Sequence, residues 1–142
     1  MTIAAILKNK GSEVLTIAVD ATVREAVSLL ADRRIGALPV VRGDEIAGIM
    51  SERDVIYRLR SDGAAVLDWP VQRIMTTPAI TVERDQQVMS ALSLMTRRRI
   101  RHLPVVEGGR IVGLVSIGDL VKHRMDKIEQ EAAAMLDYIQ ST

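Results

Sequence analysis

The sequence predicts an α+β (α/β) fold built from two tandem copies of one β-α-β-β-α unit, with flanking helices. The chain repeats itself: when residues 16–55 are aligned with residues 81–120, without a gap, 18 of the 40 positions are identical. This period of 65 residues is longer than that of the common solenoid repeats. With 142 residues the chain has the size of one compact domain, and each copy alone would be marginal. We therefore expect the two copies to pack face to face and to share a core.

Two short motifs recur at fixed places in both copies. Leu-Pro-Val-Val occupies residues 38–41 and 103–106, and Gly-x-x-Ser-x-x-Asp occupies residues 48–54 and 113–119. One copy of the second motif would be weak evidence, but two copies at one period indicate a repeated structural feature. The candidate functional atoms thus lie at the same place in each copy.

The first copy is read in order from its apolar patterns. Residues 2–10 predict a short helix that Gly11 ends. Thr22 and Glu25 form a capping box that opens a second helix. The remaining expected elements are strands at residues 14–19, 36–42 and 45–50, and a helix from residue 51 or 52 to about 60.

The second copy predicts the same order of elements. They are strands at residues 79–82, 102–107 and 110–115 and helices at 86–98 and from about 116 onward. Each copy is preceded by a short apolar segment, which we call its lead-in: the N-terminal helix for the first copy, and the segment with Val71, Ile74 and Met75 for the second. The two lead-ins match only at an offset of 68, so the connection from lead-in to first strand is three residues longer in the first copy. We divide the chain into repeat 1 with the N-terminal helix (1–63), a linker (64–73), repeat 2 (74–125) and a C-terminal helix (126–142).

The C-terminal helix carries an apolar stripe. Its members recur at spacings of three and four residues: Met125, Ile128, Ala132, Met135 and Ile139. The stripe either packs on its own domain or forms a dimer contact, and the pattern does not choose between the two.

The composition and the lack of certain motifs disfavour several classes of function. Nineteen basic residues face 18 acidic ones, and the only aromatic residues are Tyr57, Trp69 and Tyr138, which disfavours a nucleic-acid platform. The chain has no Cys and only two His, so a structural zinc site is not expected. No apolar run approaches the ~18 residues of a membrane span, and no signal-peptide pattern opens the chain. We expect a cytoplasmic protein without a membrane partner. We find no nucleophile–base pair and no phosphate-binding loop of the nucleotide-hydrolase type in the sequence, so we do not expect an enzyme.

These motifs resemble the cystathionine-β-synthase (CBS) domain family, and two such domains in tandem form a Bateman module. The resemblance rests on Leu-Pro-Val-Val, on Gly-x-x-Ser-x-x-Asp and on Ile74-Met75-Thr76, and it runs from about residue 2 to 122. It implies copies paired around a pseudo-twofold axis, with clefts that bind AMP, ADP, ATP, S-adenosylmethionine or NAD(H). It also implies a homodimer with a regulatory, non-catalytic role toward another protein.

The site is expected at the end of each copy. Ser51 with Asp54, and Ser116 with Asp119, fit an ordinary capping box, but a helix that starts there also suits a phosphate. The family resemblance implies that each Asp holds the ribose and that the Ser lies by the ribose or phosphate. An alternative is a structural homodimer whose clefts no longer bind ligand.

Charge differs between the two copies at the start of the Leu-Pro-Val-Val strand. Arg101 and His102 stand where the first copy has the small residues Gly36 and Ala37. The resemblance places phosphate contacts there, so the charged pair should bind phosphate. Arg53 could reach a second phosphate or lie on the exposed helix face. The other binding residues implied by the resemblance, including those near the base, are Thr16, Ala18, Thr81, Val82, Pro104 and Leu114.

Overall fold

The computed structural model describes residues 1–11 and 13–141 and confirms the mixed α+β class. Residues 12 and 142, which belong to the predicted first connection and the predicted last helix, lie outside the described residues. The helices are α1 (Ile3–Lys10), α2 (Val23–Arg33), α3 (Glu52–Asp62), α4 (Val88–Arg98) and α5 (Ile117–Ser141), with 3-10 helices η1 (Gly63–Asp68) and η2 (Val71–Arg73). The strands are β1 (Ile17–Ala18), β2 (Ala37–Arg42), β3 (Glu45–Ser51), β4 (His102–Glu107) and β5 (Arg110–Ser116).

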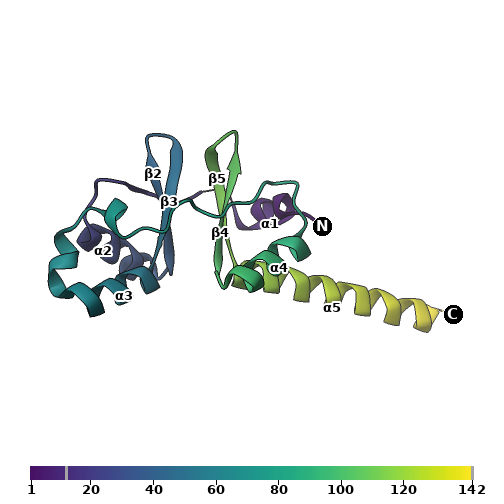
Figure 1. Ribbon diagram of the computed structural model, residues 1–142. Helices are drawn as coiled ribbons and strands as arrows, with labels where there is room; N and C mark the ends of the chain where they lie inside the picture. The colour runs from purple at the N-terminus through teal and green to yellow at the C-terminus, as the bar shows by residue number, and fades with distance from the viewer. Residues whose placement is uncertain (12, 142) are drawn as a thin grey trace.

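Two β-hairpins stand side by side at the centre of the molecule (Figure 1). The sheet order is β1-β2-β3-β5-β4, and the two hairpins meet where Glu45 of β3 pairs with Arg110 of β5. Helices α2 and α3 flank one hairpin, and α1 and α4 flank the other, while α5 projects away from the body (Figure 1). The two hairpins thus lie next to each other in one sheet.

The first strand of each repeat is shorter than the sequence predicts. In repeat 1 it is only the two residues of β1, which pair in parallel with Val40 and Val41. In repeat 2 the predicted strand at residues 79–82 is reduced to a single bridge between Val82 and Val105. The prediction was wrong in length because these segments pair along one edge only, so few backbone groups enter the ladder.

The lead-in segments pack on the opposite repeats. Three side chains of α1 — Ile3, Ile6 and Leu7 — are buried in the core of repeat 2. Val66 and Val71, in the segment predicted as a linker, are buried in the core of repeat 1. The N-terminal helix therefore packs with repeat 2 rather than with the repeat in which the sequence grouped it.

Matching hydrogen bonds show that this exchange follows the internal repeat. The Ile3 N–H donates to the Gln86 carbonyl at 2.9 Å, and the Val71 N–H donates to the Ala21 carbonyl at 2.7 Å. The donors are 68 residues apart in the sequence and the acceptors 65, as the alignment of the lead-ins and of the repeats requires. The 3-10 helices η1 and η2 thus take the place in repeat 1 that α1 takes in repeat 2.

The apolar interior consists of two clusters rather than the single shared core that we expected. One cluster combines repeat 2 with α1, and the other combines repeat 1 with residues 66–75. Each repeat closes its core with a segment from the other, because one unit of this size buries too little surface alone. None of the helices formed by the described residues combines the length and apolarity needed to cross a membrane.

Gly48 and Gly113 are needed where a lead-in crosses a strand. A Cβ at Gly48 would lie 2.6 Å from the Thr76 carbonyl oxygen, and one at Gly113 would lie 2.6 Å from a Leu7 methyl carbon. Both glycines therefore make room for the chain's own lead-in segments. The glycine that opens each Gly-x-x-Ser-x-x-Asp motif is thus required for the packing of the fold.

Candidate functional site

A full capping box positions Asp54 at the start of α3. The Asp54 Oδ2 accepts hydrogen bonds from the Ser51 N–H at 2.8 Å and the Ser51 hydroxyl at 3.1 Å, and the Asp54 N–H donates to Ser51 Oγ at 3.3 Å. Among the described residues, the other carboxylate oxygen, Oδ1, accepts only from the Thr76 hydroxyl, at 3.4 Å. The capping box thus fixes the carboxylate through one oxygen and leaves the other within reach of a ligand.

The same capping box forms at the start of α5, but a lysine covers it. The Asp119 Oδ2 accepts from the Ser116 N–H at 2.9 Å, and the Asp119 N–H donates to Ser116 Oγ at 3.1 Å. Lys10, at the end of α1, donates from Nζ to Asp119 Oδ2 at 2.6 Å and to the Leu114 carbonyl at 2.8 Å. Two residues expected to bind ligand, Leu114 and Asp119, are therefore bound to the chain's own ammonium group.

The environment of Asp119 reflects this contact. Burial by itself raises the pKa of the Asp119 carboxyl. The hydrogen bonds from Lys10 and Ser116 and the positive charge of Lys10 outweigh burial and hold that pKa below its usual range. The Asp119 carboxylate is thus ionised and partnered over the whole neutral range.

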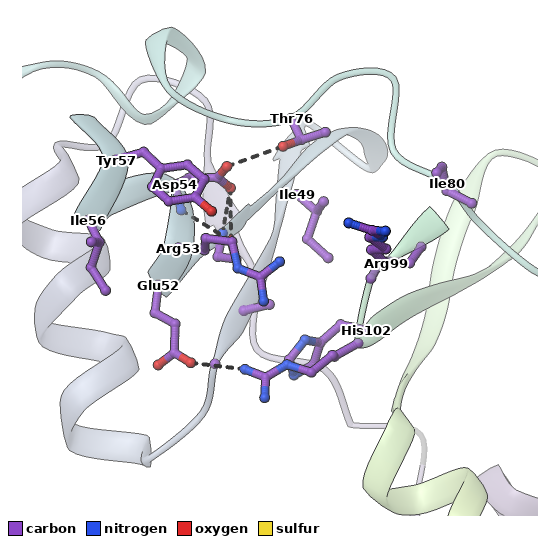
Figure 2. A pocket seen from close by; sticks show the side chains of 15 residues that line it. Ile49, Glu52, Arg53, Asp54, Ile56, Tyr57, Thr76, Ile80, Arg99 and His102 are labelled. Atoms are coloured by element: carbon purple, nitrogen blue, oxygen red, sulfur yellow. Dashed lines mark hydrogen bonds and ion pairs between the residues drawn. The ribbon is translucent and has the colours of Figure 1, made fainter. Parts of the chain in front are cut away.

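A cavity of about 360 Å³ lies next to Asp54. Both repeats contribute to it: α3 presents Asp54 and Tyr57 on one side, and Arg99 and His102 face them from repeat 2 (Figure 2). Its lining residues are Gly36, Ala37, Ile49, Ser51, Glu52, Arg53, Asp54, Ile56, Tyr57, Thr76, Ile80, Arg99, Ile100, Arg101 and His102. The volume falls within the range of small-molecule pockets. We call this space the Asp54 cavity.

The charged groups of the Asp54 cavity favour an anion. Three guanidinium groups, those of Arg53, Arg99 and Arg101, line it together with the two carboxylates of Glu52 and Asp54. Arg99 has a left-handed backbone with φ of 55°, which an arginine adopts only at a cost of roughly 1–2 kcal/mol. That conformation ends α4 and places the Arg99 side chain at the cavity.

An ion pair between two lining residues of the Asp54 cavity joins the two repeats. An Arg101 guanidinium nitrogen lies 3.2 Å from Glu52 Oε1, and both side chains are more than half exposed (Figure 2). The internal repeat has no second pair of this kind, because the counterparts of Glu52 and Arg101 are Ile117 and Gly36. The Glu52 carboxylate thus pairs with an arginine that lines both cavities.

His102 lies between the two clefts. Burial lowers the pKa of His102 below its usual value, and the positive charges of Arg101 and Lys10 lower it further, against the opposing effects of Glu52 and Asp119. The imidazole is therefore neutral near pH 7. It packs over Gly36, where an added Cβ would lie 3.2 Å from the ring carbon Cε1. The small residue in repeat 1 leaves room for the large one in repeat 2.

A second cavity, of about 420 Å³, adjoins the first. The two cavities share Gly36, Glu52, Arg101 and His102, and the second adds Arg34, Ser116 and Ile117. Asp119 does not line it, because Lys10 covers that carboxylate. The two clefts related by the repeat are thus unequal in shape and in charge.

The structure brings seven of the predicted site residues together around the Asp54 cavity: Gly36, Ala37, Ser51, Arg53, Asp54, Arg101 and His102. Ser116 lines the second cavity. Seven predicted residues line neither cavity: Thr16, Ala18, Thr81, Val82, Pro104, Leu114 and Asp119. The last two are the residues that Lys10 contacts.

Residues 81–83, which the family resemblance places near the base, do not line the Asp54 cavity. The Val82 N–H donates to the Pro104 carbonyl at 3.0 Å, so it is not available to a base, and the Val82 carbonyl accepts from the Val106 N–H at 2.9 Å. Pro104 is itself buried in β4. Instead, Thr76 and Ile80 line the Asp54 cavity. A base in this cavity would therefore meet Thr76 and Ile80, and the expected base contacts near residues 16–18 and 81–83 stay a prediction.

Sequence reasoning also missed several residues of the site: Lys10, Ile49, Glu52, Ile56, Tyr57, Thr76, Ile80, Arg99 and Ile100. One signal was available, since the large side chains of Ile56 and Tyr57 follow Asp54 within one helical turn, although the buried Val55 is the core-facing residue of that turn. Among the described residues, no cluster of three or more His, Cys, Asp or Glu side chains is placed to hold a metal ion.

Comparison with known proteins identifies the family. The CBS domain model matches residues 10–61 and 71–126. The chain is 36% identical over 148 residues to the CBS domain-containing protein CBSX3, mitochondrial, of Arabidopsis thaliana, covering 98% of this chain and 72% of that protein. It is 32% identical over 114 residues to the CBS domain-containing protein YhcV of Bacillus subtilis, covering 80% of this chain and 81% of that protein.

Solved structures show the same arrangement. The CBS-domain containing protein ATU1752 from Agrobacterium tumefaciens matches with a TM-score of 0.82 and 35% identity, over 87% of this chain and 92% of that one. The CBS domain pair of protein MJ0100, solved in complex with 5′-methylthioadenosine and S-adenosyl-L-methionine, matches with a TM-score of 0.79 and 25% identity, over 89% and 98%. With two matched domains that span most of its length, the chain belongs to the CBS domain family as a tandem pair, a Bateman module.

Proposed function

We propose that this chain is a regulatory module that binds an anionic adenosine nucleotide, such as AMP, ADP, ATP or NAD(H), in the Asp54 cavity. One observation carries the proposal: a cavity of about 360 Å³ joins a fixed carboxylate from repeat 1 to the arginines of repeat 2. A related CBS pair, MJ0100, was solved with adenosine-containing ligands. The three arginines here favour phosphates over the positively charged sulfonium of S-adenosylmethionine.

The lining residues suggest how such a ligand would lie. The Oδ1 atom of Asp54, which the capping box leaves available, would accept from the ribose hydroxyls. The base would lie against Ile49 and Ile80, which line the cavity on either side of Arg99 in the view of Figure 2. The phosphates would meet Arg53, Arg99 and the N-terminal end of α3, where the helix dipole favours negative charge.

The proposal includes one nucleotide per chain. At the second capping box, Lys10 already provides the partner of the Asp119 carboxylate and of the Leu114 carbonyl. A nucleotide there would have to displace an ammonium group that makes contacts of 2.6 and 2.8 Å. The proposed occupancy is therefore the Asp54 cavity alone.

The proposed role is regulation rather than catalysis. A ligand in the Asp54 cavity touches both repeats, so its binding would favour one packing of the two over another. A protein partner, and a second copy of the chain in a homodimer, would then respond to that packing. At ~0.3 kcal/mol for each of about two dozen heavy atoms, AMP would bind near 10 μM, which suits a sensor of nucleotide levels.

Calorimetric titration with adenosine, AMP, ADP, ATP, NADH and S-adenosylmethionine tests the proposal. We expect one anionic nucleotide to bind with a stoichiometry near one per chain. Asp54→Ala should weaken it about tenfold or more, because a hydrogen bond to a charged group contributes roughly 1.5–3 kcal/mol. Asp119→Ala, which changes the matching residue of the other cleft, should leave the affinity within about twofold.

Two results would contradict the proposal. If none of these compounds binds to protein stripped of co-purified ligand, the chain is an interaction module whose clefts serve packing alone. If Asp119→Ala abolishes binding and Asp54→Ala does not, the ligand occupies the cleft that Lys10 covers.

A further inference from the structure

The distal half of α5 presents apolar side chains that the rest of the chain does not cover. The helix has 25 residues, a length of about 37 Å at 1.5 Å per residue. Its Leu120 is fully buried, but every described residue from Ile128 to Ser141 is exposed. Figure 1 shows this half projecting away from both repeats. A helical segment of this length is marginal alone in water, so its exposed stripe calls for a partner helix.

The spacing of the stripe matches a two-helix seam. Val121, Met125, Ile128, Ala132 and Met135 follow one another at alternating intervals of four and three residues. A repeat of 3.5 residues keeps a stripe facing one partner helix along its whole length. Met125 is 56% exposed, Ile128 49% and Met135 61%, so the seam is open for most of its length.

The charges beside the stripe select the partner and its direction. Lys122 and Arg124 flank its first half, and Glu129 and Glu131 flank its second half. In an antiparallel pair with a second copy, all four would face an opposite charge. In a parallel pair, Arg124 would face Glu129, but Lys122 would face Ile117 of the other helix. The antiparallel pair therefore satisfies more of these charges.

We propose that α5 binds α5 of a second copy of this chain in an antiparallel, twofold-symmetric pair. Val121 lies opposite Ala132 of the second copy, and Met125 lies opposite Ile128. The contact is isologous, so each pairing occurs twice and the assembly closes as a dimer. This surface is separate from the Asp54 cavity and does not depend on nucleotide binding.

Disulfide trapping tests the direction of the pair. Because the chain contains no Cys, the single variants Val121→Cys and Ala132→Cys each introduce one thiol. When the two are mixed and mildly oxidised, the antiparallel pair predicts a mixed 121–132 disulfide as the main product. A parallel pair would separate these positions by 11 residues, about 16 Å along the axis, beyond the ~7 Å Cα reach of a disulfide. Predominant 121–121 and 132–132 products, or no cross-link, would overturn the proposal.

Sedimentation equilibrium tests the surface itself. We expect the unmodified protein to have twice the 15.6 kDa chain mass at micromolar concentration and Ile128→Glu to sediment as a monomer. Gln130→Glu adds the same charge on the opposite face of α5 and should remain a dimer. The proposal is wrong if the unmodified protein is a monomer, or if Ile128→Glu remains a dimer with unchanged stability.

Discussion

At the scale of single residues, Glu52 competes with a ligand for Arg101. The two side chains are paired at 3.2 Å and largely exposed, so the pair contributes at most about 1 kcal/mol. We expect Glu52→Gln to free Arg101 for phosphate and to raise the affinity of ADP or ATP up to about fivefold. The affinity of adenosine, which lacks phosphate, should not change. Calorimetric titration of the ligand series measures both effects.

Arg101→Gln provides the matched control for this prediction. It should weaken ADP and ATP binding, and the double variant should bind them no better than Arg101→Gln alone, because the gain requires the freed guanidinium. An equal gain for adenosine in Glu52→Gln would show that Glu52 acts through the shape of the cavity rather than through Arg101.

His102 should make nucleotide binding depend on pH. Burial, Arg101 and Lys10 hold the pKa of His102 below its usual value in the free protein, so the ring is neutral at pH 7. A phosphate beside the ring would favour the imidazolium and raise that pKa, so binding takes up a proton. The affinity for AMP should therefore rise as the pH falls from about 7.5 toward 6.

Titrations of wild type and His102→Gln at several pH values check this effect. The phosphate of AMP itself gains a proton near pH 6, and the variant isolates that contribution. The ratio of the wild-type to the variant affinity should rise toward acid pH. A ratio that stays constant between pH 7.5 and 6 would place the phosphate away from His102.

At this scale the sequence predicts the local contacts and misses the distant ones. Ser51 and Asp54 are three residues apart, so the capping box follows from the local motif. Lys10 and Asp119 are 109 residues apart, and their contact exists only because α1 packs on repeat 2. The covered second cleft therefore could not be predicted from the motif, which is the same in both copies.

At the scale of elements, two glycines of one motif should differ in their tolerance of a methyl group. In Gly48→Ala the new Cβ would meet the Thr76 carbonyl oxygen at 2.6 Å, a backbone atom held by pairing with Ile49. In Gly113→Ala it would meet the end of the Leu7 side chain, which can turn away. We expect Gly48→Ala to lower the free energy of unfolding by about 1–3 kcal/mol. Gly113→Ala should come closer to neutral, since alanine also restricts the unfolded chain.

Urea unfolding at equilibrium measures both variants. The slope of unfolding free energy against urea should stay at its wild-type value, so that the midpoint reports stability. Equal losses in the two variants would mean that α1 and residues 75–76 cross their strands with the same rigidity, which would contradict the geometric difference.

The sequence predicts elements well where the apolar pattern is long and less well where pairing is marginal. The helices at residues 23–33 and 88–98 and both hairpins follow from their patterns and turns, and Gly108 and Gly109 both have the positive φ that a tight hairpin turn requires. The strand expected at residues 79–82 is nearly absent, because only Val82 reaches the edge of β4. Strand propensity alone does not reveal how many backbone partners are available.

At the scale of the whole molecule, the exchange of lead-ins joins two cores into one module. The repeat in the sequence predicts two like units and their offset, but not which unit each lead-in joins. That choice depends on packing: α1 fits over β5 at Gly113, and residues 75–76 fit over β3 at Gly48. The β3–β5 ladder is limited to one residue pair, and the exchanged segments add apolar packing that ties the halves together.

This exchange predicts that a change at the N-terminus weakens the C-terminal repeat. Ile3 and its counterpart Val71 are both fully buried, in the cores of repeat 2 and repeat 1 respectively. Ile3→Ala should cost about 2–5 kcal/mol and lower the hydrogen-exchange protection of β4 and β5 more than that of β2 and β3. Val71→Ala should do the reverse. If Ile3→Ala instead weakens β2 and β3 first, α1 belongs to repeat 1 in solution, and the contact of Lys10 with Asp119 is lost with it.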